Sequence, residues 1–189
     1  MEFEKSETLQ CLINAFAGES QARNKYTFYA KTAKKENFDL ISQIFLETAE
    51  NEYEHAKLFY KEIPNGFYNP KADYPFFLGT TYENLLSASK AERDEWENLY
   101  KHASQTAKSE GYDEISKLFK NILEIEKRHS YRFSILADEL QNSTLYKKDE
   151  ITQWICTKCG HTHIGKEAPC KCPVCSHPQG YFKQFTEKY

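Results

Sequence analysis

The chain has 189 residues, 40% of them apolar and 28% charged, which is ordinary for a globular protein. A formal net charge of −3 gives no basic excess for binding a phosphate backbone, so a nucleic-acid-binding function is excluded. The N-terminal residues MEFEKSETLQ lack the apolar stretch of a signal peptide, and no segment approaches the roughly 18 apolar residues of a membrane helix. We therefore expect a cytoplasmic protein that has no membrane segment.

Four segments in the first part of the chain repeat their inward-facing residues every three or four positions, which predicts amphipathic helices. These stripes run from Leu9 to Ala33, from Phe38 to Phe59, from Leu85 to Leu99 and from Ile115 to Leu140. A short break separates the first segment from the second, and another separates the third from the fourth. Roughly twenty residues connect the second segment to the third. Two helical hairpins joined by a long crossover predict an all-α, ferritin-like four-helix bundle.

The composition changes near residue 141, where helical periodicity gives way to a polar stretch and then to short turns rich in Cys, Gly and Pro. The cysteine-rich part is too short to build an apolar core of its own. We predict a helical domain over residues 1–141, a linker over 142–153 and a small β/loop domain over 154–189.

All four helical stripes carry Glu or His where a bundle needs apolar side chains. A buried, unpaired carboxylate costs several kcal/mol, so a sequence places several of them inward only when cations compensate. Di-iron carboxylate proteins take a Glu from each of two helices and Glu-x-x-His from the other two. This sequence has that set, and the mixed O/N ligands favour iron or manganese. The predicted ligands are Glu19, Glu52, His55, Glu92, Glu126 and His129.

Two assignments within this set depend on its geometry. Glu52 and Glu126 are the natural bridges between two metals, with Glu19 and Glu92 terminal. Glu95, one turn after Glu92, is either a surface residue at the edge of the stripe or a seventh ligand that exchanges with a histidine when iron changes oxidation state. The alternative for the whole set is four solvated polar faces on differently phased helices.

The C-terminal part contains two Cys-x-x-Cys pairs, a spacing typical of tetrahedral four-thiolate sites. Sulfur ligands alone do not distinguish iron from zinc. Cys170 forms a competing Cys-x-Cys pair but lacks the two-residue spacing, and Cys11 lies near the first apolar stripe. The predicted ligands are Cys156, Cys159, Cys172 and Cys175.

Taken together, these residues resemble the rubrerythrin family, and the resemblance covers nearly the whole chain. The matching stretches are GESQARNKY at 18–26, EYEHAK at 52–57, Glu92 to Trp96, EKRH at 126–129, WICTKCG at 154–160 and CPVC at 172–175. Two features differ from the family: Lys101 stands where a Pro often follows Tyr100, and Cys170 is an additional thiol.

The resemblance implies a non-haem di-iron peroxidase that reduces hydrogen peroxide to water in oxidative-stress defence. Electrons would pass through a rubredoxin-like iron site, held by four cysteines, from a donor such as rubredoxin or an NAD(P)H-dependent reductase, within a homodimer or higher homo-oligomer. It further implies that His55 and Glu95 are alternative ligands to one iron, and that Tyr26 and Tyr100 hydrogen-bond to the carboxylates. Two other functions are compatible with the motifs: a ferroxidase or iron-handling protein, and a non-catalytic adaptor with structural zinc.

Overall fold

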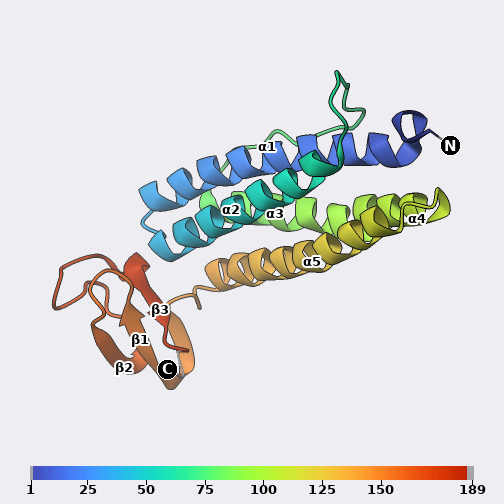
Figure 1. Cartoon of the computed structure of the whole chain (residues 1–189). Helices are drawn as coiled ribbons and strands as arrows, with labels where there is room; N and C mark the ends of the chain where they lie inside the picture. The colour runs from blue at the N-terminus through green and yellow to red at the C-terminus, as the bar shows by residue number, and fades with distance from the viewer. Residues whose placement is uncertain (1, 187–189) are drawn as a thin grey trace.

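The computed structural model describes residues 2–186 and consists of a long helical bundle with a small β module at one end (Figure 1). The bundle helices are α1 (Glu7–Lys35), α2 (Asp39–Glu62), α3 (Thr81–Asp94), α4 (Tyr100–Ser109) and α5 (Asp113–Gln141). Short helical turns occur at Phe3–Lys5 and Gln179–Tyr181, and a π-helical segment at Glu95–Leu99. The strands are β1 (Lys147–Cys156), β2 (Thr162–Glu167) and β3 (Phe182–Gln184).

The helical hairpins begin and end where local chemistry stops a helix. Ser6 caps α1 by accepting a hydrogen bond from the Leu9 amide, and Thr80 and Glu83 form a capping box before α3. The chain reverses at Asn37 and Gly111, which adopt φ values of 65° and 88°. The predicted four-helix bundle of two hairpins is thereby confirmed.

The third predicted helix is interrupted. Its α-helical hydrogen bonding stops after Asp94, continues as a π segment over Glu95–Leu99 and resumes at Tyr100. The π segment inserts a residue and shifts the phase of the helix, so Leu99, which the regular period placed inward, is 50% exposed and Tyr100 is buried instead. The irregularity begins at Glu95, the residue that sequence analysis could not place.

The apolar core is divided in two along the bundle. One cluster contains Tyr26, Phe45 and Phe133, and the other contains Phe59 and Phe119 with their neighbours. Both clusters reach the buried carboxylates, because Tyr26 of the first donates a hydrogen bond to Glu92 and Tyr100 of the second donates one to Glu19.

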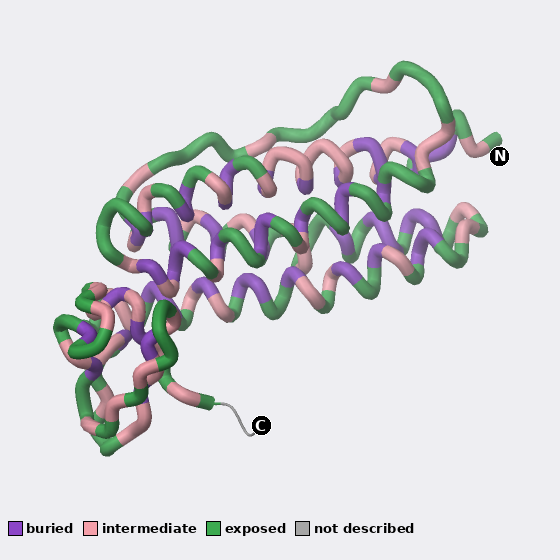
Figure 2. Tube along the Cα trace, turned by 60° about the vertical axis from the view of Figure 1, so that its left-hand side comes forward, coloured by how far each residue is buried: buried purple, intermediate pink, exposed green. Residues whose placement is uncertain are grey.

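The crossover, residues 63–80, runs along the outside of the bundle and is largely exposed (Figure 2). The side chain of Asn14 on α1 pairs with both backbone groups of Lys71, at 2.7 Å and 3.3 Å. The Tyr74 hydroxyl donates to the Asn14 carbonyl oxygen at 3.1 Å. These bonds fasten the middle of the crossover to α1.

The β module is an antiparallel sheet in the order β2-β1-β3, and its first strand begins within residues 142–153. It rests on the α1–α2 turn: a Cβ at Gly180 would lie 1.7 Å from the Asn37 carbonyl oxygen, and the Lys34 ammonium donates to the Tyr181 hydroxyl at 2.7 Å. The module is therefore seated against the end of its own bundle (Figure 1). Within residues 2–186, no helix combines the length and apolar character needed to cross a bilayer.

Candidate metal centres

The six ligand candidates of the bundle converge from four helices at one level. Ligand atoms of Glu19, Glu52, His55 and Glu126 lie within 4.8 Å of one another, as do those of Glu52, Glu92, Glu126 and His129. All six residues are buried. Glu52 and Glu126 belong to both groups, which is the arrangement that bridging ligands require.

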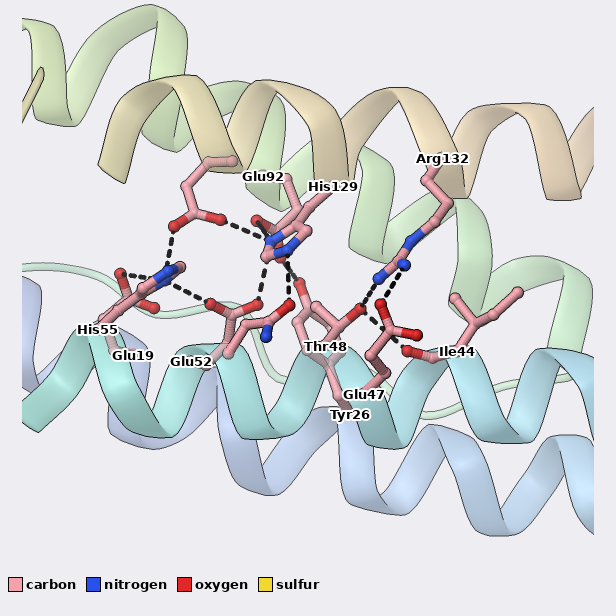
Figure 3. Close-up of polar contacts among 12 residues, drawn as sticks. Glu19, Tyr26, Ile44, Glu47, Thr48, Glu52, His55, Glu92, His129 and Arg132 are labelled. Carbon is pink, nitrogen blue, oxygen red and sulfur yellow. Dashed lines mark hydrogen bonds and ion pairs between the residues drawn. The ribbon is translucent and has the colours of Figure 1, made fainter. Parts of the chain in front are cut away.

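The two histidines face the carboxylates from opposite sides of the cluster (Figure 3). His55 Nδ1 lies 2.9 Å from Glu52 Oε2 and 2.8 Å from Glu126 Oε1. His129 Nδ1 lies 2.7 Å from Glu126 Oε2 and 3.3 Å from Glu52 Oε1. Each imidazole thus contacts both of the carboxylates that the two groups have in common.

Several of these atoms are close to one another but are not aligned to form hydrogen bonds. Among the described residues, buried atoms that lack a hydrogen bond include both oxygens of Glu52, Oε1 of Glu126, Nδ1 of His55, Oε2 of Glu19 and Oε2 of Glu92. A buried polar atom without a hydrogen bond is costly, and here such atoms gather at one place and point toward one another. A pair of cations would satisfy them, so the donor set fits a di-iron centre.

The electrostatics of the cluster lead to the same conclusion. Burial, followed by repulsion from the neighbouring carboxylates, raises the pKa of Glu19 and Glu126 well above the usual range. Burial also acts to raise the pKa of Glu52, but the two imidazoles outweigh it and lower that pKa. Burial opposes protonation of His129, yet Glu126, Glu52 and Glu92 raise its pKa to about 12. Without cations, protons must compensate the negative charge that the ligands concentrate here.

Two tyrosines, one from each aromatic cluster, hydrogen-bond to Glu92 and Glu19. The Tyr26 hydroxyl donates to Glu92 Oε1, and the Tyr100 hydroxyl donates to Glu19 Oε1. Burial and the nearby carboxylates raise both tyrosine pKa values well above 10, so the hydroxyls keep their protons and remain donors.

Asn51 is a contributor that sequence analysis missed. Its Oδ1 lies 3.2 Å from His129 Nε2, on the side of the ring away from the carboxylates. If Nε2 carries the hydrogen and donates to Asn51, the lone pair of Nδ1 faces the cluster, as a metal ligand requires. Asn51 precedes Glu52 directly, and nothing in its spacing indicates contact with another helix.

Glu95 lies at the edge of this arrangement. It is half-buried, begins the π segment and is absent from both groups of converging ligand atoms. Burial and the charges of Glu92, Glu126 and Glu52 raise its pKa well above the usual range. Glu95 is therefore beside the cluster, in a position to hold a proton.

The cysteine module forms a second converging set. The Sγ atoms of its two Cys-x-x-Cys pairs lie within 4.8 Å of one another, with two pairs at 3.7 Å. The turns are equivalent: the amide of the fifth residue donates to the first cysteine's carbonyl oxygen at 2.9 Å in each, through Gly160 and Ser176. This geometry fits a four-thiolate metal site that has no open position for a substrate. Cys170 is exposed and lies outside the set.

Comparison with protein families matches both parts of the chain. The family model described as rubrerythrin matches residues 10–137, and that described as the rubrerythrin, rubredoxin-like domain matches residues 154–183. The chain belongs to the rubrerythrin family. It accordingly combines the di-iron site of a rubrerythrin with a rubredoxin-like four-cysteine iron site.

Individual rubrerythrins are similar over almost their full length. Rubrerythrin-1 of Clostridium acetobutylicum is 46% identical and rubrerythrin of Clostridium perfringens 44% identical, with 97% of each chain covered in both cases. A structure of partially reduced nigerythrin, 27% identical, aligns with a TM-score of 0.65 over 96% of this chain and 90% of its own. A bacterioferritin from Desulfovibrio desulfuricans, 18% identical, shares the fold with a TM-score of 0.65 over 72% of this rubrerythrin-family chain and 81% of its own.

Proposed function

We propose that this protein reduces hydrogen peroxide to water, using electrons that enter through the four-cysteine module. The observation that carries the proposal is the presence, in one chain, of a carboxylate–histidine cluster with unpartnered donor atoms and a closed four-thiolate site. The six buried Glu and His residues would hold two irons, which would supply the two electrons that peroxide reduction needs, and the four cysteines would hold an iron that carries single electrons.

The residues of the chain would manage protons and geometry. Glu95 lies beside the cluster, and burial raises its pKa, so we propose that it holds a proton when it is not a ligand and donates that proton to a departing oxygen. We propose that Glu95 and His55 exchange as ligands with oxidation state. Tyr26 and Tyr100 hold Glu92 and Glu19 in position throughout.

The position of the cysteine module favours transfer between chains. Lys34, which contacts the module, is fifteen residues beyond Glu19 on α1, or about 22 Å along the helix axis. Electron-transfer rates fall exponentially with distance, so we propose a homo-oligomer in which each module serves the metal pair of a neighbouring copy. Rubredoxin or an NAD(P)H-dependent reductase would supply the module.

The function is tested on protein purified anaerobically with iron. We expect about three irons per chain, two in the carboxylate cluster and one in the cysteines, and rapid reoxidation of both centres by peroxide in preference to dioxygen. Zinc in the cysteines would favour a structural adaptor. A reduced protein that reacts with dioxygen but ignores peroxide would favour an iron-handling role.

The proposed role of Glu95 is tested by substitution. Glu95→Ala should lower the rate of peroxide turnover by about a hundredfold, as expected for the loss of a general acid, while most of the iron stays bound. Stopped-flow reoxidation together with iron analysis separates these effects. Unchanged turnover would contradict the assignment, and Glu97→Ala, at an exposed position in the same segment, is the matched control.

A further inference from the structure

A cavity of about 440 Å³ lies between α1, the π segment and the crossover. Most of its wall surface is apolar and includes Ala15, Pro75 and Leu99, but charged and polar side chains also line it, namely Lys71, Asp73, Asp94 and His102. Glu95 and Tyr100 also line it, and Tyr100 donates a hydrogen bond to Glu19. The cavity therefore borders the carboxylate cluster directly.

The cover of this cavity is held in place. Tyr74 and Pro75 of the crossover lie over it, and the bonds from Asn14 to Lys71 and Tyr74 fasten this stretch to α1. Gly18 lies beneath the cover, where a Cβ would be 3.6 Å from the Tyr74 ring. The cavity is thus a feature built from three elements, with its cover hydrogen-bonded to its wall.

Its size and lining exceed what hydrogen peroxide requires. A hydrogen peroxide molecule has about the volume of two waters, roughly 60 Å³. Cavities of about 300–1,000 Å³ with apolar walls and a few polar groups are typical of sites for organic ligands. Of the polar groups that line it, Glu95 lies beside the cluster and Tyr100 hydrogen-bonds to Glu19, whereas Lys71 and Asp73 belong to the crossover.

We propose that this cavity binds organic hydroperoxides, ROOH, with the organic group against Leu99 and Pro75 and the peroxide group toward Glu95. This inference rests on the proposed peroxidase function. The reaction is ROOH + 2H⁺ + 2e⁻ → ROH + H₂O: the O–O bond breaks, two O–H bonds form, and the electrons come from the reduced donor protein of that function.

A thiol in the cavity does not provide an alternative chemistry. Cys11 lines the cavity, and burial, followed by the charges of Glu7 and Glu110, raises its pKa to about 11. The thiolate is the form that attacks a peroxide, so this cysteine remains unreactive at neutral pH.

Binding can be tested without turnover. Full-length protein loaded with zinc as a diamagnetic substitute is titrated with tert-butanol, the product of tert-butyl hydroperoxide, and followed by ¹H–¹⁵N NMR. We expect saturable shifts at the amides of Gly18 and Ala103, which line the cavity, and their loss in Leu99→Trp. Shifts that are absent, or that do not saturate, would overturn the site.

Turnover then tests selectivity on the iron-loaded protein. Leu99 is 50% exposed, and Leu86 on α3, at 45%, is a matched position away from the cavity. The ratio of kcat/KM for tert-butyl hydroperoxide to that for hydrogen peroxide should fall about tenfold in Leu99→Trp and stay constant in Leu86→Trp. Wild-type protein that reduces hydrogen peroxide but refuses the organic substrate would overturn this inference alone. Protein that reduces neither would overturn the proposed function, and the NMR titration would still decide the binding site.

Discussion

The two histidines of the cluster differ in how they are held. His129 has the Asn51 amide behind its ring, whereas His55, among the described residues, makes its polar contacts with carboxylates of the cluster. A hydrogen bond behind a ligating imidazole fixes the ring and its tautomer. This difference agrees with the proposal that His55, and not His129, leaves the metal when Glu95 binds.

We expect Asn51→Ala to weaken iron binding about tenfold, because the substitution removes the acceptor that orients His129. Competition with a chelator measures the affinity, and circular dichroism checks that the helices persist. Asn121→Ala changes an exposed amide on α5 and serves as the control. Equal affinities in the two variants would remove Asn51 from the site.

The contrast between Asn51 and the ligands shows what a sequence reveals at this scale. Glu52 and His55 could be predicted because a carboxylate on an apolar stripe conflicts with burial, and that conflict is visible in the periodicity. Asn51 lies off the stripe and acquires its role through a contact with another helix. The roles of Tyr26 and Tyr100 were implied only by the family resemblance, since a buried tyrosine is otherwise indistinguishable from a packed aromatic.

Among the elements, the turn at Gln179–Tyr181 fixes the cysteine module to the bundle. Gly180→Ala would place a Cβ within 1.7 Å of the Asn37 carbonyl oxygen, which is backbone and has little room to move. We expect the module to separate from the bundle while both metal sites still load. Small-angle scattering should show a larger radius of gyration, and electron delivery to the bundle should change.

The control for this change is Gly165→Ala in β2. A Cβ there would approach the His163 side chain at 2.8 Å, and a side chain can rotate away. Scattering that is unchanged in Gly180→Ala would mean that the docked turn adapts.

The helices could be predicted from their hydrophobic period and the Cys-x-x-Cys pairs from their spacing. The contact between Gly180 and Asn37 could not, because it joins residues that are far apart in the sequence.

For the whole molecule, the metal-free protein should lose stability as the pH rises. The pKa values of Glu19, Glu95 and Glu126 are raised in the folded chain, as are those of His55 and His129. A group with a raised folded-state pKa stabilises the fold below its unfolded value and loses that contribution as the pH rises through the folded one. We expect the Tm of the metal-free protein to fall as the pH rises above about 5, with the contribution of His129 lost only as the pH approaches 12, and we expect bound iron to remove most of this pH dependence. A flat or rising Tm in the metal-free protein would contradict the arrangement of charges.

The electron route requires a test with two kinds of chain. One carries Cys159→Ser and Cys172→Ser and has no working cysteine module. The other carries Glu52→Gln and Glu126→Gln and has no working metal pair. Each alone should fail to couple donor oxidation to peroxide reduction.

In mixed oligomers, one chain has an intact cysteine module and the other has an intact metal pair. If the module serves a neighbour, random mixing into dimers should restore about a quarter of the wild-type rate, because half of the dimers are mixed and each contains one working combination. Differently tagged chains allow mixed dimers to be isolated, so that failure to associate is not mistaken for failure to transfer. Mixed dimers without activity would assign the route to a single chain, despite the separation of about 22 Å along α1.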